Sequence, residues 1–151
     1  MRVFLIALAV AALVAIGTAE AAISVRQLSE LPGRGRPPLA PSGAALTLAA
    51  LTLSLAVYVV FAHRLARDAI SVRRAVASGT LVGALAGAIG GTLRALLVRD
   101  YLIETLARYG LAATVSDWAL AVYVVGAVCV SAMTGAAISW WVTARRTARS
   151  A

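Results

Sequence analysis

Four long stretches of apolar residues dominate this chain of 151 residues and decide what it can fold into. They cover residues 1–22, 44–63, 75–98 and 117–142. A helix needs about 20 apolar residues to cross a hydrocarbon core of roughly 30 Å. The stretches show no alternation of apolar and polar residues, which argues against a transmembrane barrel. The sequence therefore predicts an all-α integral membrane bundle of four transmembrane helices, or three if the N-terminal segment is cleaved.

The composition agrees with a lipid environment and argues against a soluble class. The chain is 62% hydrophobic and 13% charged, with a mean hydropathy of +0.91. A soluble domain has about a quarter charged residues. All 14 basic residues are arginines, and they cluster between the apolar stretches, which is typical of membrane flanks. We therefore expect a single membrane domain over residues 1–151, with the lipid bilayer as its surroundings and no nucleic-acid partner.

The N-terminal segment, residues 1–22, has two interpretations. Arg2, an apolar run and the small-x-small sequence Ala19-Glu20-Ala21 resemble a secretory signal with a cleavage site. The alternative is an uncleaved first transmembrane helix. We favour retention because alanines at residues 7, 11, 15 and 19 form a ridge of small residues at four-residue spacing. Such a ridge suits packing against another helix.

The distribution of arginines predicts how the chain is threaded. With the N-terminus inside, the cytoplasmic segments hold eight arginines and one acidic residue, and the outer segments hold six arginines and five acidic residues. The positive-inside rule then places the basic tail, residues 143–151, in the cytoplasm. We expect a multi-pass protein of the inner cell membrane with a cytoplasmic C-terminus.

The glycines of residues 75–98 are the clearest packing signal in the sequence. Gly79, Gly83 and Gly87 are spaced by four residues, and Gly90 and Gly91 follow. One helix face is thereby stripped of side chains, as in a glycine zipper, so that another backbone can approach it closely. The last apolar stretch carries a matching ridge, formed by Ala127, Ser131, Gly135 and Ser139. We predict that the two ridges face each other, or that the glycine face forms a homo-oligomer.

Two connections on the outer side have distinct patterns. Residues 22–43 contain all four prolines and should form an extended loop. Residues 99–111 predict a short amphipathic helix at the membrane interface that ends at Gly110 in a left-handed cap. Its expected apolar face holds Leu102, Ile103, Leu106 and Tyr109, and its polar face holds Asp100, Glu104 and Arg108. The alternative is a re-entrant element that lines a pore.

Arg94 is the main candidate for a polar site. It lies about one turn before the outer end of its helix, where its cost in lipid is lower than at the bilayer centre. Glu20 and Asp117 lie on the same outer side, so that either carboxylate can pair with it. The functional interpretation is a site for a small anion or a proton, and the structural one is an arginine that reaches the interface and is neutralised by a neighbour.

The sequence predicts no enzyme, metal site or cofactor. It has one histidine, His63, and one cysteine, Cys129, and it lacks a carboxylate pair, a Ser/His/Asp set and a phosphate-binding loop. We expect a small membrane protein that acts through helix–helix contacts, as an accessory or assembly subunit of a membrane complex or as a self-associating bundle. The alternative is a small-solute channel or transporter with the glycine face and Arg94 near its path. A weaker one is a pore-forming lysis factor.

Overall fold

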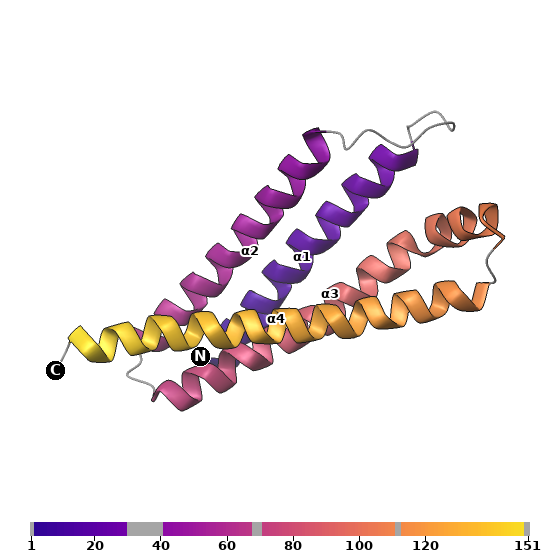
Figure 1. The fold of residues 1–151 in the computed structure, drawn as a ribbon. Coiled ribbons are helices and arrows are strands. Elements are labelled where there is room, and N and C mark those ends of the chain that lie inside the picture. Colours follow the sequence, from indigo (N-terminus) through magenta and orange to yellow (C-terminus); the bar gives the residue numbers. More distant parts are fainter. Residues whose placement is uncertain (1, 30–40, 68–70, 111–112, 150–151) are drawn as a thin grey trace.

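The computed structural model describes residues 2–29, 41–67, 71–110 and 113–149, and these form four helices (Figure 1). They are α1 (Arg2–Ser29), α2 (Pro41–Arg67), α3 (Val72–Arg108) and α4 (Ala113–Arg149). Each helix is long and apolar enough to cross a membrane. The prediction of an all-α chain with four such helices is therefore confirmed.

The helices are longer than the apolar stretches that predict them. α1 continues to Ser29, so that residues 23–29, expected as loop, are helical. The rest of the proline-rich segment, residues 30–40, lies outside the described residues. α2 begins at Pro41, where a proline is tolerated because the first turn of a helix has no intrahelical partner for its N–H group. α4 begins at Ala113 instead of residue 117 and extends to Arg149.

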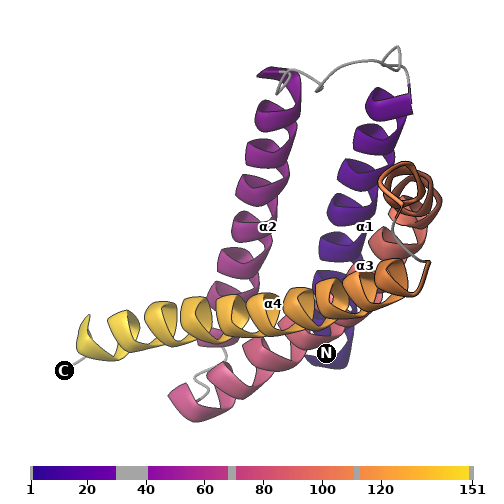
Figure 2. The same ribbon diagram turned by 45° about the vertical axis from the view of Figure 1, so that its right-hand side comes forward.

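The four helices form two pairs that cross each other (Figures 1 and 2). α1 lies beside α2, and α3 lies beside α4 along most of its length. The most extensive contact is between α3 and α4, and α1 makes the next most extensive one with α3. The start of α1 and the end of α4 lie at the same end of the molecule, together with the end of α2 and the start of α3 (Figure 1).

The segment expected as a separate interfacial helix is the C-terminal part of α3, which continues without a break from Val72 to Arg108. Its last turns run in a different direction from the rest of α3 (Figures 1 and 2). The predicted left-handed cap is confirmed, since Gly110 has a φ of 72° and its N–H donates to the carbonyl oxygen of Ala107. On its expected apolar face Leu102, Ile103 and Leu106 are half-buried and Tyr109 is exposed.

α1 packs through a different face from the predicted one. The alanines at residues 7, 11, 15 and 19 are exposed. The buried row is displaced by two residues and consists of Ala9, Leu13, Gly17 and Ala21. Both rows have four-residue spacing, and the second one faces α3 because Gly17 admits a side chain from that helix.

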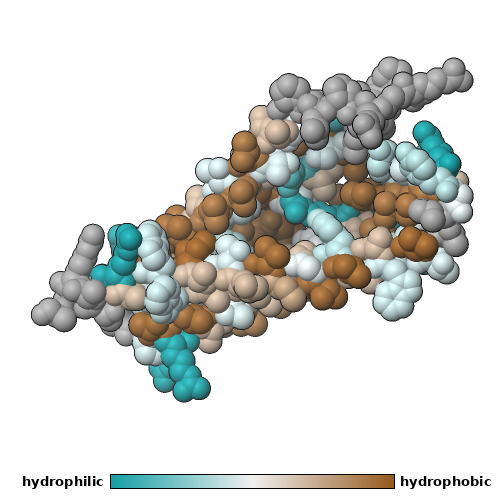
Figure 3. Space-filling model, viewed as in Figure 1, coloured by the Kyte–Doolittle hydropathy of each residue, from teal (hydrophilic) through white to brown (hydrophobic). Residues whose placement is uncertain are grey.

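The interior is small, and most large apolar side chains face outward. The main core cluster consists of Ala9, Val10, Leu13, Tyr58, Phe61, Leu65, Val82 and Ala86. Leu48, Val60 and Leu96 are each about three-fifths exposed, and apolar residues cover much of the surface in Figure 3. Soluble monomers rarely expose apolar patches of this extent, and the surface is that expected of helices in contact with lipid.

Candidate functional site

The seam between α3 and α4 is built from glycines on one side and small residues on the other. Gly79 of α3 lies against Gly135 and Ser139 of α4. One turn further along, Gly83 lies against the backbone of Ser131 and Ala132. The next turn places Gly87 against Ala127 and Val128. The two ridges that the sequence predicts therefore face each other within one chain.

The seam leaves no room for side chains on the glycines. A Cβ atom on Gly87 would lie 2.6 Å from the carbonyl oxygen of Ala127 and 2.7 Å from the Cα atom of Val128. A Cβ atom on Gly83 would meet the carbonyl oxygen of Ser131 and lie 2.8 Å from the Cα atom of Ala132. Contacts this close bring Cα–H groups within reach of carbonyl oxygens, and they replace the hydrophobic driving force that is missing between helices in lipid.

The two remaining glycines of the series divide between different neighbours. Gly91 still faces α4, where its Cβ atom would lie 3.1 Å from the Cβ atom of Ala127. Gly90 faces α1 instead, where its Cβ atom would lie 3.7 Å from the Cα atom of Val14. The glycine face is thus occupied by α4 and α1 of the same chain.

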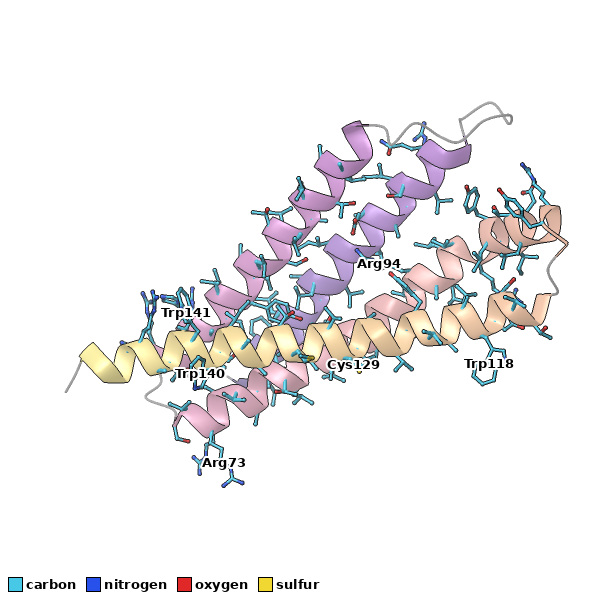
Figure 4. The ribbon with its side chains drawn as sticks, viewed as in Figure 1. Arg73, Arg94, Trp118, Cys129, Trp140 and Trp141 are labelled. Atoms are coloured by element: carbon cyan, nitrogen blue, oxygen red, sulfur yellow. The ribbon has the colours of Figure 1, made fainter. Side chains whose placement is uncertain are left out.

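Arg94 joins α3 to α1 close to this seam. Its Nε atom donates a hydrogen bond of 2.7 Å to the carbonyl oxygen of Gly17, and its Nη2 atom forms an ion pair with Oε2 of Glu20. The side chains of Arg94 and Glu20 are 29% and 17% exposed, so both charges are largely removed from solvent. Figure 4 shows the Arg94 side chain in the space between α3 and α1. The pairing satisfies a charge that would be costly alone in lipid.

Of the two carboxylates that the sequence offers to Arg94, the structure pairs Glu20 with it and places Asp117 elsewhere. An oxygen of Asp117 lies 4.0 Å from Nη2 of Arg99, and both side chains are well exposed. A separate surface pair, Glu104 with Arg108, has the favourable i,i+4 order and a distance of 2.6 Å. These exposed pairs contribute little to stability.

Gly17 is a residue of this site that the sequence reasoning missed. A Cβ atom at Gly17 would lie 3.0 Å from Nε and 3.1 Å from Cζ of Arg94, so that any other residue would crowd the guanidinium where it approaches the backbone. The available signal is its position three residues before Glu20, since residues at that spacing share a helix face. A glycine and a carboxylate on one face form a niche for a cation from another helix.

A small cavity with polar groups lies where all four helices meet. Its volume is about 110 Å³. Its polar groups come from Arg94 of α3, Ser54 and Tyr58 of α2, and Ser131 of α4. The hydroxyl of Tyr58 donates a hydrogen bond of 3.3 Å to the carbonyl oxygen of Ser131. Figure 3 shows hydrophilic residues on the wall of a hollow between the two helix pairs. A polar cavity of this size can hold ordered water or a small ion.

Tyr58 is the second residue that the sequence reasoning missed. Its side chain is 5% exposed, although tyrosine in a membrane helix is most common near the interface. Its position in the middle of an apolar stretch was the signal available, because a buried tyrosine hydroxyl usually has a hydrogen-bond partner.

The remaining candidate residues do not join the site around Arg94. His63 is exposed, and its Nδ1 atom lies 3.2 Å from the carbonyl oxygen of Val59 in its own helix. Cys129 is exposed on α4. Within the described parts of the chain, no group of three or more His, Cys, Asp or Glu side chains could hold a metal ion. No protein-family model, curated protein or solved structure matches this chain.

Proposed function

We propose that the chain is a multi-pass protein of the inner cell membrane that acts through helix–helix contacts and carries out no catalysis. It serves as an accessory or assembly subunit of a membrane complex, or associates with copies of itself. The observation that supports this role is the outward face of α4. Only 6% of the most apolar stretch of α4 is buried, compared with 39% for α3.

The outward face of α4 presents one continuous row of exposed residues. These are Trp118, Val122, Val125, Cys129 and Met133. Their spacing of three or four residues places them on one side of the helix. Trp118 points away from the other helices in Figure 4. The opposite side of α4 is committed to the seam with α3, so that α4 can bridge α3 and a second membrane helix.

Photo-crosslinking from the membrane tests this role. A photoreactive residue is placed at Val125, which is 63% exposed on α4, or at Val60, which is 59% exposed on α2 and serves as the matched control. We expect a protein adduct from position 125 and none from position 60. An adduct of twice the monomer mass indicates self-association, and any other mass identifies a partner subunit by mass spectrometry. Lipid adducts alone from both positions would contradict the proposal.

The proposed orientation places the N-terminus and the C-terminus in the cytoplasm. At the end of the molecule that holds the start of α1 and the end of α4, the described residues include eight arginines and no acidic residue. The described residues at the opposite end include four arginines and four acidic residues. The positive-inside rule therefore favours a cytoplasmic basic end. A C-terminal fluorescent protein should fluoresce, whereas a C-terminal alkaline phosphatase should be inactive; the reverse result would invert the orientation.

The cavity beside Arg94 supports a second candidate function, a path for a small solute. Its polar groups come from α2, α3 and α4, and the glycines of the seam form part of its wall. Purified protein in liposomes should then conduct chloride or protons, and Arg94→Leu should abolish the flux. Tyr58→Phe leaves the charge intact and tests the contribution of the hydroxyl. Absence of flux for both ions in the unmodified protein would argue against this function.

A further inference from the structure

We propose that a pocket between the C-terminal ends of α2 and α4 binds the headgroup of an anionic phospholipid that carries two phosphate groups. The pocket has a volume of about 460 Å³ and lies at the basic end of the molecule. It is lined by His63, Ala66 and Arg67 of α2 and by Trp141, Val142, Arg145 and Arg146 of α4.

The charge of the pocket favours an anion. Three guanidinium groups line one space, and none of the lining residues is acidic. Like charges that line one pocket repel one another, and this repulsion is relieved when an anion binds between them. Guanidinium groups bind phosphate through two parallel N–H···O bonds. A ligand with two phosphates can bind Arg67 of α2 through one phosphate and Arg145 of α4 through the other.

The floor of the pocket indicates a lipid as the source of the phosphates. Ala66 and Val142 are each 7% exposed and belong to a cluster that continues through Ala62 to Ile138, toward the apolar middle of the two helices. A charged rim above an apolar floor suits an amphiphile with its phosphates at the rim and its glycerol against the floor. A free phosphate would gain nothing from this floor.

Trp141 indicates that the rim of the pocket lies at the depth of the lipid headgroups. The guanidinium carbon of Arg145 lies 4.1 Å from the centroid of the Trp141 ring, which is a cation–π contact. Tryptophan is enriched at the depth of lipid headgroups. In Figure 4, Trp141 lies on the side of α4 that faces α2, and Trp140 lies on the other side. The stacked pair therefore holds one cation of the pocket at headgroup depth.

Two other arginines provide a matched control. Arg73 and Arg74 lie at the start of α3, at the same end of the molecule, and both are exposed. Neither lines the pocket, and Arg73 points away from it in Figure 4. A pair of substitutions there changes the net charge by the same amount as Arg67→Gln with Arg145→Gln. General attraction to an anionic membrane surface responds to both pairs alike, whereas a specific pocket responds to one pair only.

The test measures lipid binding to the full chain in phosphatidylcholine nanodiscs. Trp118→Phe and Trp140→Phe leave Trp141 as the only tryptophan, and brominated cardiolipin, which has two phosphodiesters, quenches its fluorescence on binding. We expect Arg67→Gln with Arg145→Gln to weaken cardiolipin binding about tenfold or more. We expect Arg73→Gln with Arg74→Gln to change it by less than about twofold. Circular dichroism checks that all variants retain their helices.

Three results would overturn the proposal. The first is an equal loss of binding in the two double variants. The second is equal quenching by brominated phosphatidylglycerol, which has one phosphodiester, at matched phosphate concentration. The third is displacement of the lipid by free pyrophosphate at the same concentration, which would assign the pocket to a soluble anion. None of these depends on the outward face of α4, so that the lipid site and the proposed subunit role can fail independently.

Discussion

The Nε atom of Arg94 donates a hydrogen bond of 2.7 Å to the carbonyl oxygen of Gly17, a residue 77 positions earlier in the chain. The same guanidinium pairs with Glu20, one turn further along α1. An arginine of α3 is thus held by both the backbone and a side chain of α1, and this contact fastens the first helix pair to the second.

Loss of the Arg94 side chain should destabilise the protein more than loss of the Glu20 charge. Arg94→Leu leaves the Glu20 carboxylate with no partner in a largely buried position, whereas Glu20→Gln keeps an oxygen that can accept from Arg94. We expect a loss of about 1–3 kcal/mol for Arg94→Leu, measured by thermal unfolding in detergent. The double variant Arg94→Leu with Glu20→Gln should recover part of this loss, and simple addition of the two single effects would show that the residues are not coupled.

Substitution of Gly17 should disturb the same contact through sterics. A Cβ atom at Gly17 would lie 3.0 Å from Nε of Arg94, and Gly17→Val adds two further methyl groups at this crowded position. We expect a loss of stability of about 1–3 kcal/mol. Gly126→Val is the control, because a Cβ atom at Gly126 has no neighbour within 4 Å. Similar losses at the two positions would mean that helix propensity, and not the approach of Arg94, is being measured.

Substitution of Gly83 should open the seam between α3 and α4. Gly83→Ala places a methyl group against the carbonyl oxygen of Ser131, a backbone atom that cannot rotate away. We expect a loss of roughly 1–3 kcal/mol from overpacking. Gly126→Ala, in the open position on α4, should be neutral or stabilising by up to about 1 kcal/mol. Thermal unfolding of the two alanine variants gives the comparison, and equal stabilities would disprove the tight seam.

Removal of the Tyr58 hydroxyl should have a smaller effect. Tyr58→Phe deletes the hydrogen bond to Ser131 but keeps the ring in the core. Hydrogen bonds between membrane helices contribute about 0.6 kcal/mol on average, so we expect a loss of that order. Tyr123→Phe, at an exposed position on α4, is the control. An effect of Tyr58→Phe as large as that of Arg94→Leu would show that the cavity depends on the hydroxyl more than its single bond indicates.

The mature chain should retain α1. This helix supplies Gly17 and Glu20 to Arg94 and contributes Ala9, Val10 and Leu13 to the main core cluster. Cleavage after Ala21 would leave Arg94 without these partners. The intact mass of the protein purified from membranes measures this directly, and a mass that starts near residue 22 would refute it.

Much of the fold can be predicted from the sequence, because a helix in lipid must satisfy its own backbone and needs a fixed minimum of apolar residues. The number of helices follows from this rule, but their ends do not. Arg99 and Asp100 mark the end of an apolar stretch without ending α3, since a charged residue outside lipid is tolerated in a helix. The glycine spacing also identifies the face of α3 that packs, because four-residue spacing defines one ridge.

Which helix packs against a given face cannot be predicted from the sequence of that helix alone, because it depends on how all the helices are arranged. α1 has two rows of residues at four-residue spacing. One consists of the alanines at 7, 11, 15 and 19, and the other consists of Ala9, Leu13, Gly17 and Ala21. The second row packs against α3, where Arg94 forms a hydrogen bond with Gly17. In the same way, Glu20 and Asp117 are equally available to Arg94 until α1, and not the start of α4, is known to lie beside it.

The seam between α3 and α4 limits how these two helices can slide. A screw motion of α3 by one residue, about 1.5 Å along its axis and about 100° around it, would bring Ala84 and Ala88 to the places of Gly83 and Gly87, where a methyl group meets backbone atoms. A displacement by four residues, about 6 Å, would again oppose glycines to the small residues of α4. Motion along the seam is therefore restricted to steps of about one helical turn.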